Sequence, residues 1–198
     1  MKYILTITFY LFSLFLLGQE PTSTTFFKPY PENFAVKHAV EIEGIVPVYF
    51  TGGYSVGLGY RYKKVRLRAN VLNGGTFNIE NTGIENSATT FKRFYLTAPS
   101  IYLGLNVWRN LEVYTFLEFQ NFNIMQRSTE VKKSLKSTDT GLGIGYQLFI
   151  GRYFYIQPGV QLNVRAKNAL AFSGATYQIP TQDVSFVLRV GVRLWKKF

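Results

Sequence analysis

The chain of 198 residues contains no cysteine, which excludes a disulfide framework, a cysteine-based metal site and an acylated lipoprotein cysteine. Aromatic residues make up 17% of the chain, a content typical of proteins whose rings pack at a membrane interface. The net charge of +11 is compatible with an anionic partner, and for an exported chain we expect that partner to be lipid phosphate and not nucleic acid.

The N-terminus has the pattern of a secretory signal peptide. Lys2 precedes an apolar run from Tyr3 to Leu17, and polar Gln19 follows. A run of about 15 residues is too short for a membrane-spanning helix, which needs ~20. We expect residues 1–19 to be a signal peptide and residues 20–37, rich in Pro, Ser and Thr, to be a periplasmic lead-in to one domain over residues 38–198.

From residue 38 onward, apolar and polar residues alternate in eight segments, which is the period of β-strands. The clearest is 54–62, where Tyr54, Val56 and Leu58 alternate with Ser55 and glycines. The predicted strands lie at 38–50, 54–62, 65–71, about 95–108, 111–124, around 141–148, around 155–165 and 184–195. Prolines 47, 99 and 158 predict bulges, because proline removes a ladder donor, and the pattern slips after Asn121.

The connections between these segments alternate in length. Short turns lie at Lys63-Lys64, Arg109-Asn110 and Gly151-Arg152, whereas long polar segments cover 73–93, 126–137 and 167–182, with one tight hairpin at 51–53. This alternation predicts an all-β, eight-stranded antiparallel transmembrane β-barrel with short turns on one rim and long loops on the other. Strands of nine residues or more favour a membrane barrel over a secreted sandwich, whose strands average ~5 to 6.

The polar face of the predicted strands should line the barrel interior. It combines small residues with arginines and glutamates that we expect to form a salt-bridge network: Glu41, Glu43, Arg61, Arg66, Arg68, Glu112, Glu118, Arg165, Arg189 and Arg193. An eight-stranded barrel is only just wide enough for its own side chains to fill. We therefore expect a closed lumen.

The chain resembles the OmpA/OmpX-type small outer-membrane barrels over about residues 38–198. The resemblance rests on the strand rhythm and on the terminal stretch 184–198. In these families a final alternating strand with a C-terminal Phe is the signal read by the barrel-assembly machinery. Four residues match that signal: Val190, Val192, Leu194 and Phe198. Lys196 departs from it, because this position is usually apolar or aromatic.

This resemblance implies the outer membrane of a Gram-negative cell, with both termini periplasmic and with outer-membrane lipids, lipopolysaccharide and the barrel-assembly machinery as partners. Lys132, Lys133 and Lys136 lie in a predicted external loop and are the best candidates to bind lipopolysaccharide phosphate or an acidic partner, although a solvated charge run is the simpler interpretation.

The sequence offers little for catalysis. The only histidine, His38, lies on the predicted periplasmic rim, away from outer-leaflet lipid. The acidic residues lie among arginines that would keep them ionised, and no metal-ligand spacing is present. We therefore expect no catalytic residue, cofactor or metal.

The leading functional hypothesis is a non-enzymatic outer-membrane barrel with a plugged polar lumen, which contributes to envelope integrity or to surface interaction through its external loops. A narrow pore for small solutes or ions is the alternative, favoured if the inward glycines leave a continuous water path. A lipid-modifying enzyme is a third hypothesis. The sequence identifies no ligand or surface partner.

Overall fold

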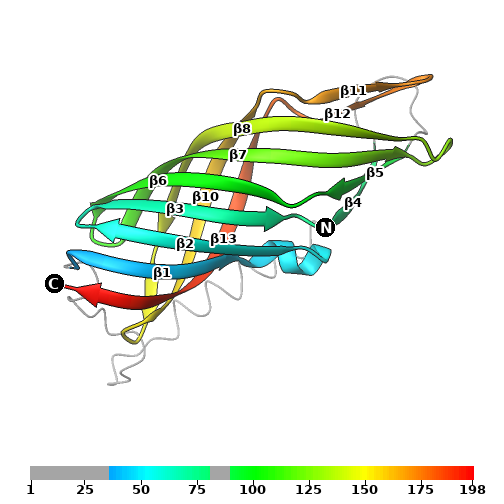
Figure 1. Ribbon diagram of the computed structural model, residues 1–198. Helices are drawn as coiled ribbons and strands as arrows, with labels where there is room; N and C mark the ends of the chain where they lie inside the picture. The colour runs from blue at the N-terminus through cyan, green and yellow to red at the C-terminus, as the bar shows by residue number, and fades with distance from the viewer. Residues whose placement is uncertain (1–35, 81–89) are drawn as a thin grey trace, which may run out of the picture.

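The computed structural model describes residues 36–80 and 90–198, so the predicted signal peptide and nearly all of the predicted lead-in lie outside the described residues. Eight strands pair in an antiparallel ladder that closes on itself, in the order β1-β2-β3-β6-β7-β8-β10-β13 and back to β1 (Figure 1). These are β1 (His38–Ile45), β2 (Tyr54–Tyr62), β3 (Val65–Asn73), β6 (Ala98–Trp108), β7 (Leu111–Gln126), β8 (Lys132–Tyr146), β10 (Phe154–Arg165) and β13 (Gln182–Lys197). The predicted fold class, an all-β, eight-stranded antiparallel barrel, is confirmed.

The barrel has two different ends. At one end lie the short turns and the C-terminus, and we call it the short-turn end (Figure 1). At the other end the 16-residue β7 and the 15-residue β8 continue past their neighbours and meet two added hairpins. The hairpins are β4 (Thr76–Glu80) with β5 (Thr90–Tyr95), and β11 (Ala169–Phe172) with β12 (Ala175–Gln178). We call these hairpins and the adjoining ends of β7 and β8 the head.

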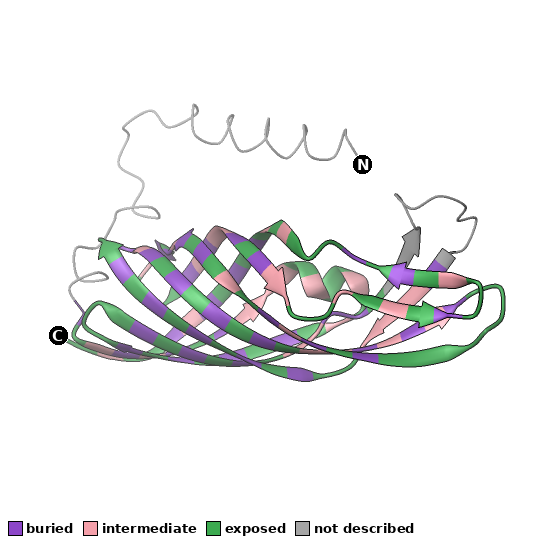
Figure 2. Ribbon diagram, turned by 90° about the horizontal axis from the view of Figure 1, so that it is seen from above, coloured by how far each residue is buried: buried purple, intermediate pink, exposed green. Residues whose placement is uncertain are grey.

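The two faces of the barrel wall differ in burial and in polarity. Along β2, each residue in turn is exposed or buried, and the same stripes run along the other barrel strands (Figure 2). The exposed residues of β2 are apolar or aromatic, and the buried ones are Ser55, Gly57, Gly59 and Arg61. Because successive side chains of a strand point to opposite faces, the polar set lies inside the barrel and the apolar set outside.

The connections at the short-turn end agree with the sequence prediction. Lys63, Arg109 and Gly151 have positive φ values of 51°, 49° and 70°, so each begins its turn in a left-handed conformation. The turns at Lys63 and Arg109 have two residues, whereas the turn at Gly151 extends to Tyr153. β9 (Leu148–Ile150) then pairs with β10 beside the last of these turns.

The connections at the head end differ from the prediction. The first strand does not reach residue 50: it ends at Ile45, and Val46–Thr51 form a 3-10 helix with Pro47 in its first turn, where no donor is needed. No described helix has the length and apolarity to cross a membrane. The long segment predicted at 73–93 contains β4 and the start of β5, and the one predicted at 167–182 contains the β11–β12 hairpin. The second half of the loop predicted at 126–137 is the start of β8.

The predicted ladder irregularities are also corrected. No register shift occurs at Pro99 or Pro158: the β6–β7 ladder starts only at Ser100, and the β8–β10 ladder is interrupted between Gly145 and Leu148 without a change of register. Register shifts occur instead at Val40/Glu41 and between Asn106 and Trp108.

The slip expected after Asn121 is likewise absent, because β7 and β8 stay in register from Leu111 to Met125. What changes there is the chemistry of the inward face, which becomes apolar where β7 leaves the barrel and enters the head.

Candidate functional site

The centre of the barrel is closed by a network of ion pairs around Arg66. The Arg66 guanidinium lies 2.6 Å from Glu41, 2.7 Å from Glu43 and 3.0 Å from Glu112. It also donates to Oε1 of Gln157 at 3.0 Å and to the Tyr155 hydroxyl at 2.6 Å. Side chains from β1, β3, β7 and β10 therefore meet across the lumen at one guanidinium.

Arg68 and Arg189 extend this network toward the head. Arg68 pairs with Glu112 at 3.0 Å and with Glu43 at 3.4 Å, and Nε of Arg189 lies 3.5 Å from Glu43. Both guanidiniums also stack at about 5 Å from the rings of Tyr102 and Tyr114. The aromatic rings thus cover the side of the network that faces the head.

Arg193 and Arg61 lie on the other side of the network, toward the short-turn end. Arg193 donates to Oε1 of Glu41 at 2.8 Å and covers the ring of Phe149 at 4.4 Å. The structure therefore joins seven of the ten predicted charges into one cluster through ion pairs: Glu41, Glu43, Arg66, Arg68, Glu112, Arg189 and Arg193. Arg61 is buried beside them and donates to the neutral Gln147.

Glu118 and Arg165 do not form ion pairs with this cluster. Glu118 accepts hydrogen bonds from the Tyr102 hydroxyl and from Nε2 of Gln120, nearer the head. Arg165 pairs with Asp183 at 2.7 Å and with Asp139 at 3.3 Å, two acids that the sequence analysis did not include. Both acids lie on inward positions of their strands, so the same alternation that selected the glutamates would have found them.

Large neighbours occupy the space beside several of the inward glycines. A Cβ on Gly143 would lie 2.3 Å from Cζ of Tyr114, and a Cβ on Gly191 would lie 2.3 Å from Cζ of Tyr155. On Gly104 it would lie 1.8 Å from Oε1 of Glu112. Glycine is required at these positions so that a ring or a carboxylate can cross the lumen.

On the head side of the network lies a cavity of about 360 Å³ with a mixed polar and apolar lining. Its polar lining residues include Glu118, Gln120, Asp139, Asn163 and Arg165, and its apolar ones include residues of the 3-10 helix and of β13. The central arginines are not part of the lining.

The head has an apolar core of its own, which the sequence analysis missed. Inward residues of β5, β7 and β8 pack against the β11–β12 hairpin through Phe91, Phe122, Ile124, Leu135, Phe172, Tyr177 and Ile179. The rings of Phe91 and Phe172 lie 5.3 Å apart. Burial raises the pKa of the Tyr177 hydroxyl, which accepts a hydrogen bond from Nη1 of Arg93 at 3.2 Å.

The three lysines predicted to form an external basic loop lie on strand β8 in the head. Their side chains do not lie on one face of the strand. Lys132 and Lys136 have the parity of the outward face, whereas Lys133 has the opposite parity. Nζ of Lys133 donates to the carbonyl oxygen of Ala171 at 2.7 Å and covers the ring of Phe172 at 5.1 Å, so Lys133 holds the β11–β12 hairpin.

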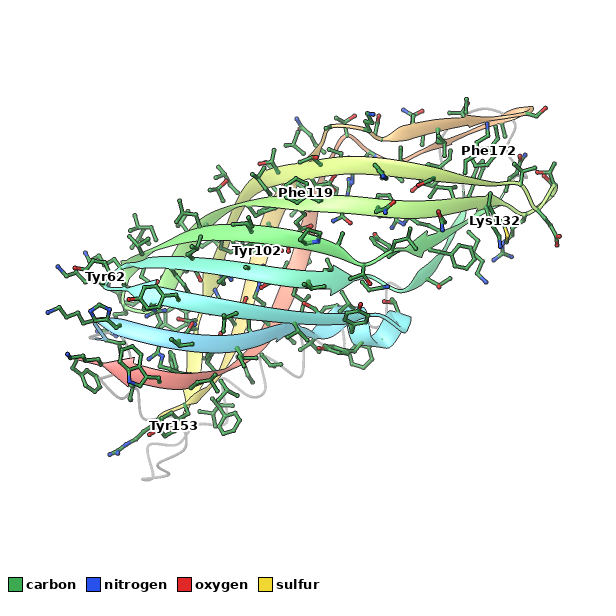
Figure 3. All side chains as sticks on the ribbon, viewed as in Figure 1. Tyr62, Tyr102, Phe119, Lys132, Tyr153 and Phe172 are labelled. Carbon is green, nitrogen blue, oxygen red and sulfur yellow. The ribbon has the colours of Figure 1, made fainter. Side chains whose placement is uncertain are left out.

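Aromatic and basic residues gather at the short-turn end. His38 lies among them: its Nδ1 is 2.8 Å from the Tyr60 hydroxyl, and its ring lies 5.1 Å from that of Tyr62 and 6.4 Å from that of Trp195. Figure 3 places Tyr62 and Tyr153 at this end, opposite Lys132 and Phe172. His38 is thus held among aromatic partners at the short-turn end.

The proposed assembly residues also lie near this end. Val190, Leu194 and Phe198 are exposed, and Val192 is half-buried on the same outward face of β13. Lys196 interrupts this face and lies 5.2 Å from the Phe198 ring.

Within residues 36–80 and 90–198, no group of three or more histidine or acidic side chains could hold a metal ion.

In comparisons with known proteins, no family model and no curated protein matches the chain. Several solved chains are similar in fold, including the two that follow. The N-terminal β-barrel domain of Pseudomonas aeruginosa OprF is 13% identical, with 79% of this chain and 96% of that chain covered and a TM-score of 0.42. Neisserial surface protein A is 12% identical, with 79% of this chain and 92% of that chain covered and a TM-score of 0.40.

Proposed function

We propose that the protein is a non-enzymatic outer-membrane barrel that does not conduct. In this proposal both termini are periplasmic, the ion-pair network plugs the lumen, and the head is presented outside the cell as the surface through which the protein contributes to envelope integrity or surface interaction. The short turns then face the periplasm and the head faces the medium.

The observation that carries the membrane location is the inverted polarity of the barrel. Arg66 is 0% exposed and Glu41 is 0% exposed, whereas the outward Leu58 and Leu142 are 57% and 61% exposed. In water this arrangement would cost free energy on both faces, because charges lose hydration inside and apolar side chains stay wet outside. Hydrocarbon around the barrel removes the second cost, and the ion pairs offset the first.

The outward face also has the aromatic boundary of a membrane protein. Tyr60, Tyr62, Trp108 and Trp195 are exposed around the short-turn end, and the Trp108 ring is covered by Arg109 at 4.8 Å. Amphipathic rings beside basic groups suit the headgroup region of a bilayer.

The closed lumen favours a structural or surface role over a pore. A path along the axis would have to pass Arg66, whose three carboxylate partners come from β1 and β7, and then the rings over Arg68 and Arg189. Glu112 and Tyr114 also occupy the space beside Gly104 and Gly143.

The test is ion conductance of the refolded barrel in a planar bilayer, after heat-modifiable migration on a gel has shown that the sample is folded. A general porin run in the same bilayers is the positive control. We expect no channel steps from the folded barrel. Discrete steps of uniform size would overturn the plugged interior and assign the protein to the narrow pores.

A further inference from the structure

A groove on the outward face lies where the apolar wall of the barrel gives way to the head. It has a volume of about 400 Å³, and Lys136 and Lys167 lie on its rim. Its other lining residues are Thr97, Ala98, Pro99, Phe119, Gln120, Asn121, Ser137, Thr138 and Ala166. No acidic side chain belongs to this lining.

Strand register places the groove at the edge of the apolar band. Phe119 is opposite Thr138, and the next outward pair toward the head is Asn121 with Lys136. Phe119 is 44% exposed and has the same outward parity as Leu117, Val113 and Leu111 below it. Figure 3 shows Phe119 along the barrel between Tyr62 at the short-turn end and Lys132 in the head. Lys136 therefore stands one outward position above the last aromatic ring of the band.

Backbone contacts fix the second lysine beside the first. The Ala166 amide donates to the Thr138 carbonyl oxygen at 3.1 Å, and the Lys167 amide donates to Oγ of Ser137 at 3.2 Å. The segment that follows β10 is thus hydrogen-bonded to Ser137 and Thr138 of β8, next to Lys136 in the sequence. Both lysines are exposed.

We propose that this groove binds the phosphate of an outer-leaflet glycolipid of the lipopolysaccharide type, through Lys136 and Lys167. The inference rests on the proposed membrane location, in which the head end faces outward. Two ammonium groups with hydroxyl and amide neighbours supply charge and hydrogen bonds for a phosphate, and the exposed Phe119 below them contacts an acyl chain. A soluble phosphate would bind the two lysines without contacting the Phe119 ring.

The proposal narrows the basic set predicted from the sequence. Lys133 is engaged with Ala171 and Phe172, and Lys132 lies four residues further into the head, opposite Met125. Of the three lysines predicted from the sequence, Lys136 is the one that lies at the edge of the apolar band. In the proposed site Lys167, from the segment between β10 and β11, takes the place of Lys132 and Lys133.

The experiment compares binding of diphosphoryl lipid A to the folded barrel in lipid nanodiscs of zwitterionic phospholipid, with inorganic phosphate as the second probe. The variant Lys136→Gln/Lys167→Gln removes the two charges of the groove. Lys63→Gln/Lys64→Gln removes two charges from the short-turn end and is the matched control.

We expect the groove variant to bind lipid A about 10- to 30-fold more weakly than the wild type, because the loss of each charge should weaken binding by somewhat less than tenfold. We expect the control variant to bind like the wild type. Equal affinity in the groove variant, an equal loss in both variants, or inorganic phosphate that competes for the site at concentrations near those of lipid A would each overturn the lipid site. If the wild-type barrel folds in detergent but does not enter the nanodisc, the membrane location itself is wrong, which is a different failure.

Discussion

Replacing Arg66 by methionine tests whether the ion-pair network stabilises the barrel. Arg66 contacts three buried carboxylates, and each of them keeps at least one other arginine: Glu41 keeps Arg193, Glu43 keeps Arg68 and Arg189, and Glu112 keeps Arg68. Removing one partner of a buried ion pair typically costs about 3–5 kcal/mol, because a charge is left desolvated. Since every carboxylate retains an arginine, we expect a loss of about 3–5 kcal/mol rather than three times that amount.

Arg61→Met is the matched control. Arg61 is as buried as Arg66, but its hydrogen bond is to the neutral Gln147, so the loss should be about 1–3 kcal/mol, the cost of an unsatisfied polar group. Urea unfolding of the refolded barrels, followed by the fluorescence of Trp108 and Trp195, measures both free energies. If Arg66→Met costs no more than Arg61→Met, the network does not stabilise the barrel in the way described.

Three further predictions concern the other parts of the molecule. Gly143→Ala should destabilise the barrel by about 1–3 kcal/mol, because its Cβ would meet the Tyr114 ring at 2.3 Å, whereas Gly59→Ala, with 3.4 Å to its nearest atom, should be nearly neutral; equal urea midpoints would contradict this. Phe91→Ala should make the β11–β12 hairpin sensitive to limited proteolysis and leave heat-modifiable migration unchanged, and a barrel that unfolds as a whole would show that the head is not separate. Phe198→Ala should reduce the amount of barrel assembled in cells without slowing refolding in detergent, and an equal defect in both settings would argue against an assembly signal.

The barrel strands could be predicted because period-two alternation is a local signal. The predicted strand 54–62 coincides with β2, and the parity that selected Arg66 and Glu112 is the parity that faces the lumen. The interaction partners of a charged residue are not set by the local sequence, because they depend on where along the barrel axis each tilted strand places that residue. Glu118 therefore interacts with Tyr102, and Arg165 pairs with Asp139 and Asp183. The alternation predicts that these side chains face inward, but it does not predict which of them pair.

The head was missed for a related reason. Phe122 and Ile124 keep the inward parity of β7, but they are apolar at positions where the alternation predicts polar residues. The reason is that the inside of the barrel is polar, whereas the inside of the head is apolar. The change of environment is set by hairpins from distant parts of the chain. Likewise, the strand expected to end at residue 50 was overridden by Pro47, which starts a 3-10 turn more readily than it joins a ladder.

The continuity of β7 and β8 from the short-turn end into the head determines how any partner would meet the protein. Their ladder runs without a register shift from Leu111 to Met125, so these two strands carry the hydrogen-bonded wall of the barrel into the head. A molecule that docks on β7 and β8 would meet a backbone that is already paired, and it would avoid the entropic penalty of ordering flexible segments there. Contact with these strands would be a rigid-body encounter, with specificity set by surface shape and charge rather than by folding on contact.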